Sequence, residues 1–330
     1  MVVFVAGMDF DFTGVQAAWR EKGAALGREV AREATAASVV MGAARLGLLD
    51  PTADLLALAA AVEALARESA AGAVILALHS GTALAVAGDG RFSSLFGGGA
   101  VAAVGLSSDE VPLEQGGRLS GRAPWVAPLT DRGLAVVGPR RGGGRAAYAV
   151  ALAAPGVTIE IVSTAGLAGL VCGHVVFDDA VCEPIGATVP IMTRIRILMA
   201  AAGLGIGRRA LHEALTTARA ARTAAAGEQT VQGLLADAAT ELDAAMLMTW
   251  KAAGAGTASL AEASLAKLMA TGAAQRAVER ATQVIGADTF QRGHIIERLA
   301  QDVRALELFA GRTEALRAAV AEEVLPPVRT

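Results

Sequence analysis

The sequence predicts a mainly α-helical protein with one small β domain near the middle of the chain. Of its 330 residues, 54% are hydrophobic and only 4% are aromatic, which predicts a large aliphatic core. Apolar residues recur at helical spacing up to about residue 100 and again after residue 190. Between these regions lie short β-branched runs separated by Gly, Pro and Asp. The expected order along the chain is therefore helices, then strands, then a C-terminal bundle of long helices.

The N-terminal region, residues 1–100, is expected to form a helical domain. Phe12–Glu33 mixes apolar and charged residues, and Ala53–Ser69 carries apolar residues at helical spacing with Glu63 and Arg67 on its polar face. Both segments have the length and spacing of helices that bury one face.

Residues 101–187 are expected to form a β-barrel-like domain. The glycine-rich segment Arg141–Arg145 suits a hairpin loop between two of its strand-forming runs. The expected strands lie at Leu134–Val137, Ala147–Leu152, Val157–Val162 and Val175–Phe177.

Residues 188–330 are expected to form a four-helix bundle. Helical spacing extends over four segments, at 191–222, 228–253, 258–285 and 293–323. Because an average helix has about 11–12 residues, helices of about twice that length indicate an antiparallel bundle. The glycine series Gly203–Gly207 indicates close helix packing, since no strand precedes it as a dinucleotide-binding site requires.

Charge and composition argue against several functional classes. A net charge of −3 and a pI near 5.9 do not fit a nucleic-acid binder. Apolar runs such as Ile197–Gly207 fall short of the roughly 18 residues of a membrane span. Cys172 and Cys182 fit free thiols in the cytoplasm, and the four histidines lack the spacing of metal ligands. We therefore expect a cytoplasmic protein without nucleic-acid, membrane or metal partners.

Several short motifs follow one another in a characteristic order. In the β region, Leu119–Trp125 reads Leu-Ser-Gly-Arg-Ala-Pro-Trp. In the bundle, Leu235–Asp237 reads Leu-Ala-Asp, Ser264–Lys267 reads Ser-Leu-Ala-Lys, Gln283–Gly286 reads Gln-Val-Ile-Gly and Asp302–Arg304 reads Asp-Val-Arg. In this order and spacing, the sequence resembles the acyl-CoA dehydrogenase family over nearly the whole chain.

The resemblance implies that an acyl-CoA thioester is desaturated between Cα and Cβ. In this family a glutamate removes the α-proton while hydride passes from Cβ to N5 of FAD. The flavin thus carries the redox chemistry, and the carboxylate acts as general base.

The resemblance also assigns roles to individual residues. The set implied for FAD is Trp125, Arg219 or Arg222, Gln229, Gln283 and Gly286. Arg196 matches an arginine beside the CoA pocket. Plain structural interpretations remain open beside these roles: Trp125 as a core residue, Gln283 and Gly286 as a helix C-cap, and Arg196 as a side chain that snorkels from the bundle surface.

The catalytic carboxylate of the family is missing from this sequence. The usual Tyr-Glu-Gly-Thr segment reads Phe-Ala-Gly-Arg at 309–312, so Ala310 occupies the base position. In a minority of members the base directly precedes the arginine that Arg196 matches, and here that residue is Ile195. Glu307, one helical turn before Ala310, is a candidate displaced base, although an exposed helix glutamate is the commoner case.

Three functions remain open on these residues. The chain is expected to be a degenerate subunit of a hetero-oligomeric acyl-CoA dehydrogenase, an oxidoreductase of lipid metabolism, in which a paralogous subunit supplies the glutamate. FAD would then be bound across the subunit interface. The alternatives are a homomeric dimer or tetramer that uses Glu307 or a substrate group as base, and a non-catalytic pseudoenzyme scaffold.

Overall fold

The N-terminal region contains four helices in its described residues up to 83, and a side-chain N-cap marks the start of each. The computed structural model describes residues 12–106, 112–131, 133–138, 146–220 and 228–325. Thr13, Thr35, Asp54 and Ser69 each accept a hydrogen bond from a backbone N–H in the first turn of the helix that follows, which satisfies one of its unpaired donors. These helices are α1 (Gly14–Val30), α2 (Ala36–Arg45), α3 (Leu55–Glu68) and α4 (Ala70–Ala83).

Helix α4 lies at the centre of the helical core. All 14 of its residues are buried, in agreement with a sequence that is apolar on every side. A short 3₁₀ helix η1 (Gly90–Phe92) and helix α5 (Ser93–Phe96) lead from α4 to the first strand.

A single buried histidine joins α4 to this connection. His79 has no exposed surface, its Nε2 lies 3.0 Å from the carbonyl oxygen of Leu95, and its Nδ1 accepts the N–H of Ala102 at 3.1 Å. Nε2 is therefore the protonated nitrogen of a neutral ring. Burial lowers the pKa of His79 to about 4, although the hydrogen bond with Leu95 opposes this shift.

In the described ranges, eight strands form two four-stranded sheets. One sheet has the order β1-β4-β5-β8 and the other β2-β3-β7-β6. β1 and β4 pair in parallel and the remaining neighbours pair antiparallel. The inner faces share a core that includes Leu119, Phe177 and Tyr148. The strands are β1 (Val101–Gly105), β2 (Leu113–Gln115), β3 (Arg118–Val126), β4 (Gly133–Val137), β5 (Ala146–Ala151), β6 (Val157–Val162), β7 (Cys172–Val181) and β8 (Glu183–Ala187).

These sheets confirm the β-rich part of the predicted fold. All four strand segments expected from the sequence coincide with β4, β5, β6 and part of β7. The hairpin loop expected at Arg141–Arg145 lies outside the described residues, but the flanking strands β4 and β5 do pair antiparallel.

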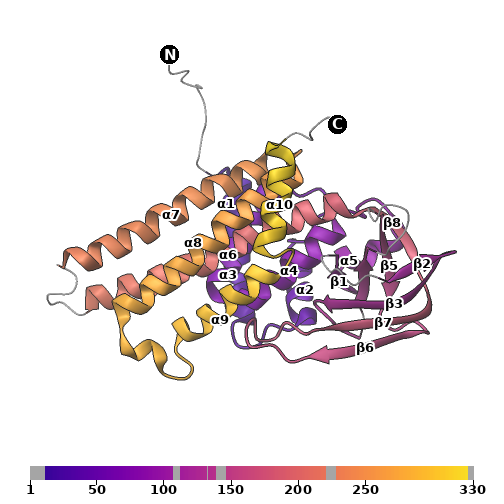
Figure 1. Ribbon diagram of the computed structural model, residues 1–330, viewed down its shortest axis with the longest axis horizontal. Coiled ribbons are helices and arrows are strands. Elements are labelled where there is room, and N and C mark those ends of the chain that lie inside the picture. The colour runs from indigo at the N-terminus through magenta and orange to yellow at the C-terminus, as the bar shows by residue number, and fades with distance from the viewer. Residues whose placement is uncertain (1–11, 107–111, 132, 139–145, 221–227, 326–330) are drawn as a thin grey trace, which may run out of the picture.

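The C-terminal part is a bundle of long helices beside the N-terminal helices (Figure 1). α6 packs along α3, α4, α7 and α8, and the buried apolar residues of α1–α4 and α6–α9 form one continuous core. The bundle consists of α6 (Thr188–Ala220), α7 (Gln229–Gly254), α8 (Leu260–Ile285), the 3₁₀ helix η3 (Ala287–Phe290), α9 (Ile295–Leu308) and α10 (Thr313–Val324).

One sequence prediction in the bundle is wrong. The helix expected over 293–323 is two helices, α9 and α10, separated by residues 309–312. The break arises because Ala310 and Gly311 adopt φ angles of 58° and 114°, which no right-handed helix contains. Ala310 gives no sign of this in a helical pattern, since alanine is the best helix former.

The glycine series on α6 packs as expected. A Cβ at Gly205 would overlap the backbone oxygen of Glu63 on α3, and one at Gly207 would lie 2.6 Å from Cδ2 of Leu242 on α7. α6 is apolar and long enough to cross a membrane by composition alone, but 83% of its most apolar 18-residue window is buried inside the protein. We interpret it as a core helix.

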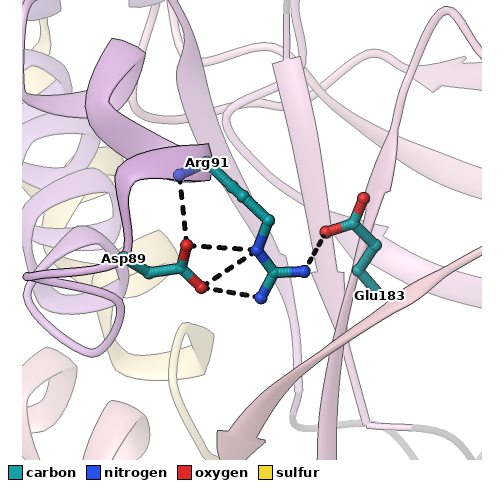
Figure 2. A network of polar contacts seen from close by, with 3 residues as sticks. All are labelled: Asp89, Arg91 and Glu183. Carbon is teal, nitrogen blue, oxygen red and sulfur yellow. Dashed lines mark hydrogen bonds and ion pairs between the residues drawn. The ribbon is translucent and has the colours of Figure 1, made fainter.

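Figure 2 shows an ion network between the N-terminal helices and the strands. Arg91 of η1 contacts Asp89 at 2.6 Å and Glu183 of β8 at 2.7 Å. All three side chains are at least one third exposed, so solvent weakens their interaction. The network orients Arg91 more than it stabilises the fold.

Candidate functional site

The base position predicted from the sequence lies in the turn between α9 and α10. Ala310 is 7% exposed and adopts the left-handed conformation, and Gly311 follows with a still larger positive φ. A non-glycine residue at positive φ is uncommon. The turn, residues 309–312, therefore depends on contacts from its surroundings.

Two buried cations supply those contacts. Arg196 of α6 donates from Nε to the carbonyl oxygen of Ala310 at 3.0 Å and from Nη1 to Oγ of Ser264 at 2.7 Å. Lys267 of α8 donates from Nζ to the carbonyl oxygens of Gly311 at 2.8 Å and Glu307 at 3.1 Å. α6 and α8 thus both hold the turn by its backbone.

Burial lowers the pKa values of both cations. For Lys267, which has no exposed surface, the pKa falls to about 7, through desolvation first and the positive charge of Arg196 second; the negative charge of Glu307 acts in the opposite direction. Desolvation also lowers the pKa of Arg196. A guanidinium nevertheless stays protonated at neutral pH, so Lys267 is the group that titrates here.

The second base position of the family is closed by packing. Ile195 has no exposed surface and lies against Gly81 of α4, where an added Cβ would be 2.7 Å from Cγ1 of Ile195. Neither Ile195 nor Ala310 offers an atom that accepts a proton. The structure therefore brings both candidate base positions next to Arg196 without a carboxylate at either.

Glu307, the candidate displaced base, lies on α9 with its carboxylate already engaged. Oε1 accepts the hydroxyl of Thr313 at 2.9 Å and Oε2 accepts Nη1 of Arg304 at 3.3 Å. Its side chain is 31% exposed. These are the contacts of a helix-end surface glutamate, and its use as a base remains a hypothesis.

Trp125 is turned out of the β core. The residue is 55% exposed, and its ring packs edge to face with the ring of His174 at a centroid distance of 5.7 Å. The pairing of β3 with β7 shifts register between Ala123 and Val126, and Trp125 adopts a φ of 55° there. This bulge aims a large aromatic ring at solvent, so the interpretation as a core residue is wrong. An exposed planar ring on a rigid strand fits a flavin.

The other residues assigned to FAD lie elsewhere. Arg219 lies in the last turn of α6, Gln229 begins α7, Gln283 lies in the last turn of α8, and Gly286 follows α8 directly. These helix ends meet at the end of the bundle that points away from the strands (Figure 1). Gly286, with a φ of 82°, is the C-cap of α8, as the plain interpretation has it. Arg222 lies outside the described residues.

Arg196 does not snorkel to the surface, because it is 7% exposed and directed into the bundle. Its placement beside the CoA pocket remains a prediction. In the described part of the chain, no group of three or more His, Cys, Asp or Glu side chains is arranged to hold a metal ion.

Sequence reasoning gave no role to three polar residues of this region. Lys267 and Ser264 were part of a family motif, yet their partners lie far away in the chain: Lys267 donates to the carbonyl oxygen of Gly311, and Ser264 accepts a hydrogen bond from Arg196 of α6. Asp302 accepts the N–H of Leu167 at 2.6 Å and so ties α9 to the loop between β6 and β7. The available signal was a lone lysine and a lone aspartate at otherwise apolar helix positions, since such residues are rarely buried unless they have partners.

Comparison with known proteins places these elements in context. Residues 187–325 match the family model described as acyl-CoA dehydrogenase, C-terminal domain. The chain is 32% identical to the 3-sulfinopropanoyl-CoA desulfinase of Paraburkholderia xenovorans, over 52% of this chain and 49% of that protein. It is 30% identical to the mitochondrial short-chain specific acyl-CoA dehydrogenase of Bos taurus, over 64% of this chain and 57% of that protein. The chain thus spans about half the length of the curated relatives it matches.

The fold is similar to that of solved structures at lower identity. The structure of butyryl-CoA dehydrogenase from Megasphaera elsdenii superposes with a TM-score of 0.84 at 19% identity, covering 96% of this chain and all of that one. This likeness confirms the predicted fold class: helices, a small β domain and a C-terminal bundle.

Proposed function

The chain belongs to the acyl-CoA dehydrogenase family, and on that premise we propose that it is the base-less subunit of a heteromeric enzyme that desaturates an acyl-CoA thioester with FAD. The observation that carries the proposal is Ala310, a methyl group in a turn that is otherwise fully formed. A paralogous subunit with a glutamate at this position would supply the proton acceptor. We place the complex in the cytoplasm.

Trp125 is the residue of this chain that would lie against the flavin ring. Bound FAD supplies the hydride acceptor for the Cβ hydride. The exposed indole on a strand bulge gives the ring a flat, rigid apolar surface and shields it from water on one side.

The remaining FAD residues support a cofactor shared between subunits. Arg219, Gln229, Gln283 and Gly286 lie at the far end of the bundle from the strands (Figure 1). α6 alone has 33 residues and so spans about 50 Å. Because Trp125 and this end of the bundle are so far apart, they would serve two different FAD molecules, each completed by a neighbouring subunit.

The test compares this chain alone with the chain co-expressed beside a family member that carries the Tyr-Glu-Gly-Thr turn. We expect little visible flavin absorbance from the chain alone, and a co-purifying flavoprotein from the pair. Trp125→Ala in the pair should release flavin, whereas Ile161→Ala, at another exposed apolar position of the β part, should not. A fully flavinylated, active homo-oligomer of this chain alone would refute the proposal.

One comparison supports a second candidate. The Paraburkholderia xenovorans relative, which aligns over 189 residues, is named a desulfinase of a CoA thioester and not a dehydrogenase. In a homomeric enzyme of that kind, the bond between carbon and the sulfinate sulfur would break, water would supply the proton to carbon and the hydroxyl to sulfur, and no net oxidation would require a glutamate at position 310. Release of sulfite from 3-sulfinopropanoyl-CoA by the chain alone, without bleaching of flavin, would favour this candidate over the first.

A further inference from the structure

Three carbonyl oxygens in and next to the turn at 309–312 accept long-range hydrogen bonds from basic side chains. The donors are Lys267 for Glu307 and Gly311, and Arg196 for Ala310. These contacts join residues 40 to 114 positions apart in the chain. α6 and α8 thus hold the backbone of the turn, in addition to the hydrogen bond from Thr313 of α10 to Glu307 of α9 that closes it locally.

The two cations lack the partner that buried charges ordinarily have. Among the described residues, neither Arg196 nor Lys267 forms an ion pair with a carboxylate, and their hydrogen-bond acceptors are neutral carbonyls and the hydroxyl of Ser264. Burying charges in this way is costly unless they are fully hydrogen-bonded. Two buried basic groups side by side, with the pKa of Lys267 lowered to about 7, therefore need a structural reason to be there.

The conformation of the turn supplies that reason. Ala310 is held at a φ that alanine rarely adopts, and its carbonyl oxygen is the acceptor of Arg196 Nε. At Gly311, an added Cβ would lie 3.1 Å from Nη2 of Arg196, so the guanidinium packs directly on the glycine backbone. Because all these contacts are made to backbone atoms, they do not depend on which side chain stands at 310.

We infer that Arg196 and Lys267 are positioning residues that together brace the 309–312 turn, so that position 310 keeps the backbone conformation of a base-bearing residue although alanine occupies it. The brace consists of Arg196, Lys267 and Ser264. The claim that the brace holds position 310 for catalysis rests on the proposed function. The claim that it holds the backbone of the turn does not. The two are therefore tested separately.

The structural test measures amide hydrogen exchange at residues 309–313. Lys267→Met removes both carbonyl contacts at nearly constant volume, and we expect exchange there to accelerate at least about tenfold while β3 and β7 stay protected. Lys251→Met, at an exposed lysine, is the matched control. Unchanged exchange in a folded Lys267→Met protein would overturn the inference.

Should Lys267→Met fail to fold, Arg196→Lys carries the same test. It keeps the charge but cannot reach both Ala310 and Ser264, and Arg194→Lys is its control on the same helix. Faster exchange at 309–313 in Arg196→Lys, with none in Arg194→Lys, supports the brace; equal exchange in both refutes it.

The catalytic test uses Ala310→Glu in the FAD-loaded complex, with the partner subunit's own glutamate replaced by glutamine so that position 310 alone can supply the base. If the turn is held as inferred, the introduced carboxylate should allow an acyl-CoA to reduce the flavin, which is seen as bleaching. Ala310→Asp, one methylene shorter, should reduce the flavin at least about tenfold more slowly. Adding Arg196→Lys should lower kcat with little change in KM and move the acid limb of the pH profile upward, because a cation beside the carboxylate is displaced. A side chain with a purely structural role would not move that limb.

These outcomes separate the two ideas. If no pairing of the chain binds FAD, the proposed function fails, and amide exchange still decides the brace. If FAD binds and Ala310→Glu leaves the flavin oxidised with every acyl-CoA tried, position 310 is not held for catalysis, and the inference fails while the proposed function stands.

Discussion

Acidification should destabilise this protein through one residue, His79. Its ring is buried and neutral, and its Nδ1 accepts the N–H of Ala102. Protonation would place an N–H of the ring against that donor. The pKa of His79 is lowered from 6.5 to about 4, so between these values the unfolded chain binds a proton that the folded chain does not. His79 therefore supports full stability above about pH 6.5, and that stability is lost as the pH falls towards 4.

The size of the effect follows from the shift. A difference of about 2.5 pKa units corresponds to about 3 kcal/mol in the free energy of unfolding over the whole window, and to about 2 kcal/mol between neutral pH and pH ~5. The assay is urea denaturation followed by circular dichroism at these two pH values, for the natural chain and for His79→Gln.

Glutamine is the informative replacement, since its amide can donate to the carbonyl of Leu95 and accept from Ala102 without titrating. His79→Gln should lower stability by about 1–2 kcal/mol at neutral pH. However, it should lose about 2 kcal/mol less than the natural chain on acidification. Carboxylates that titrate in the same range are common to both proteins and cancel. Equal acid sensitivity of the two proteins would refute the reasoning.

The remaining predictions concern packing and surface contacts. Gly205→Ala should destabilise the fold by at least about 2 kcal/mol in the same denaturation assay, because its Cβ would overlap the backbone of Glu63, whereas Gly233→Ala, with open space around it, should not. Asp302→Ala should cost about 1–3 kcal/mol, since it leaves the N–H of Leu167 unpaired; a loss no greater than that of an exposed aspartate would contradict this. Arg91→Met should leave the denaturation midpoint where a surface control leaves it, because the ion network in Figure 2 is exposed, and a clear shift would show that this expectation is wrong.

The sequence predicted the fold well where the signal is local. Helical spacing located α1, α3, α6, α7 and α8 to within a few residues, and β-branched runs located four strands. It failed at 293–323, because the turn that breaks the helix is hydrogen-bonded by Arg196 and Lys267, which lie on other helices. It also could not say that Trp125 faces outward, since the register shift that turns it depends on pairing with β7. Contacts made over long sequence separations are the part that residue patterns do not contain.

The hydrogen bonds of Arg196 and Lys267 to backbone oxygens also predict how the fold responds to a carboxylate at position 310. A turn that is held through backbone oxygens tolerates any side chain that does not clash, so folding and proton abstraction are separable at position 310. Ala310→Glu should accordingly lower the free energy of unfolding by no more than about 3 kcal/mol, because alanine and glutamate pay a similar cost for a positive φ and the remaining cost is desolvation of one carboxylate at a position that is 7% exposed. A large loss would mean that the surroundings of Ala310 have closed over the site. An unchanged stability would mean that the turn accepts a carboxylate at position 310 without a change of fold.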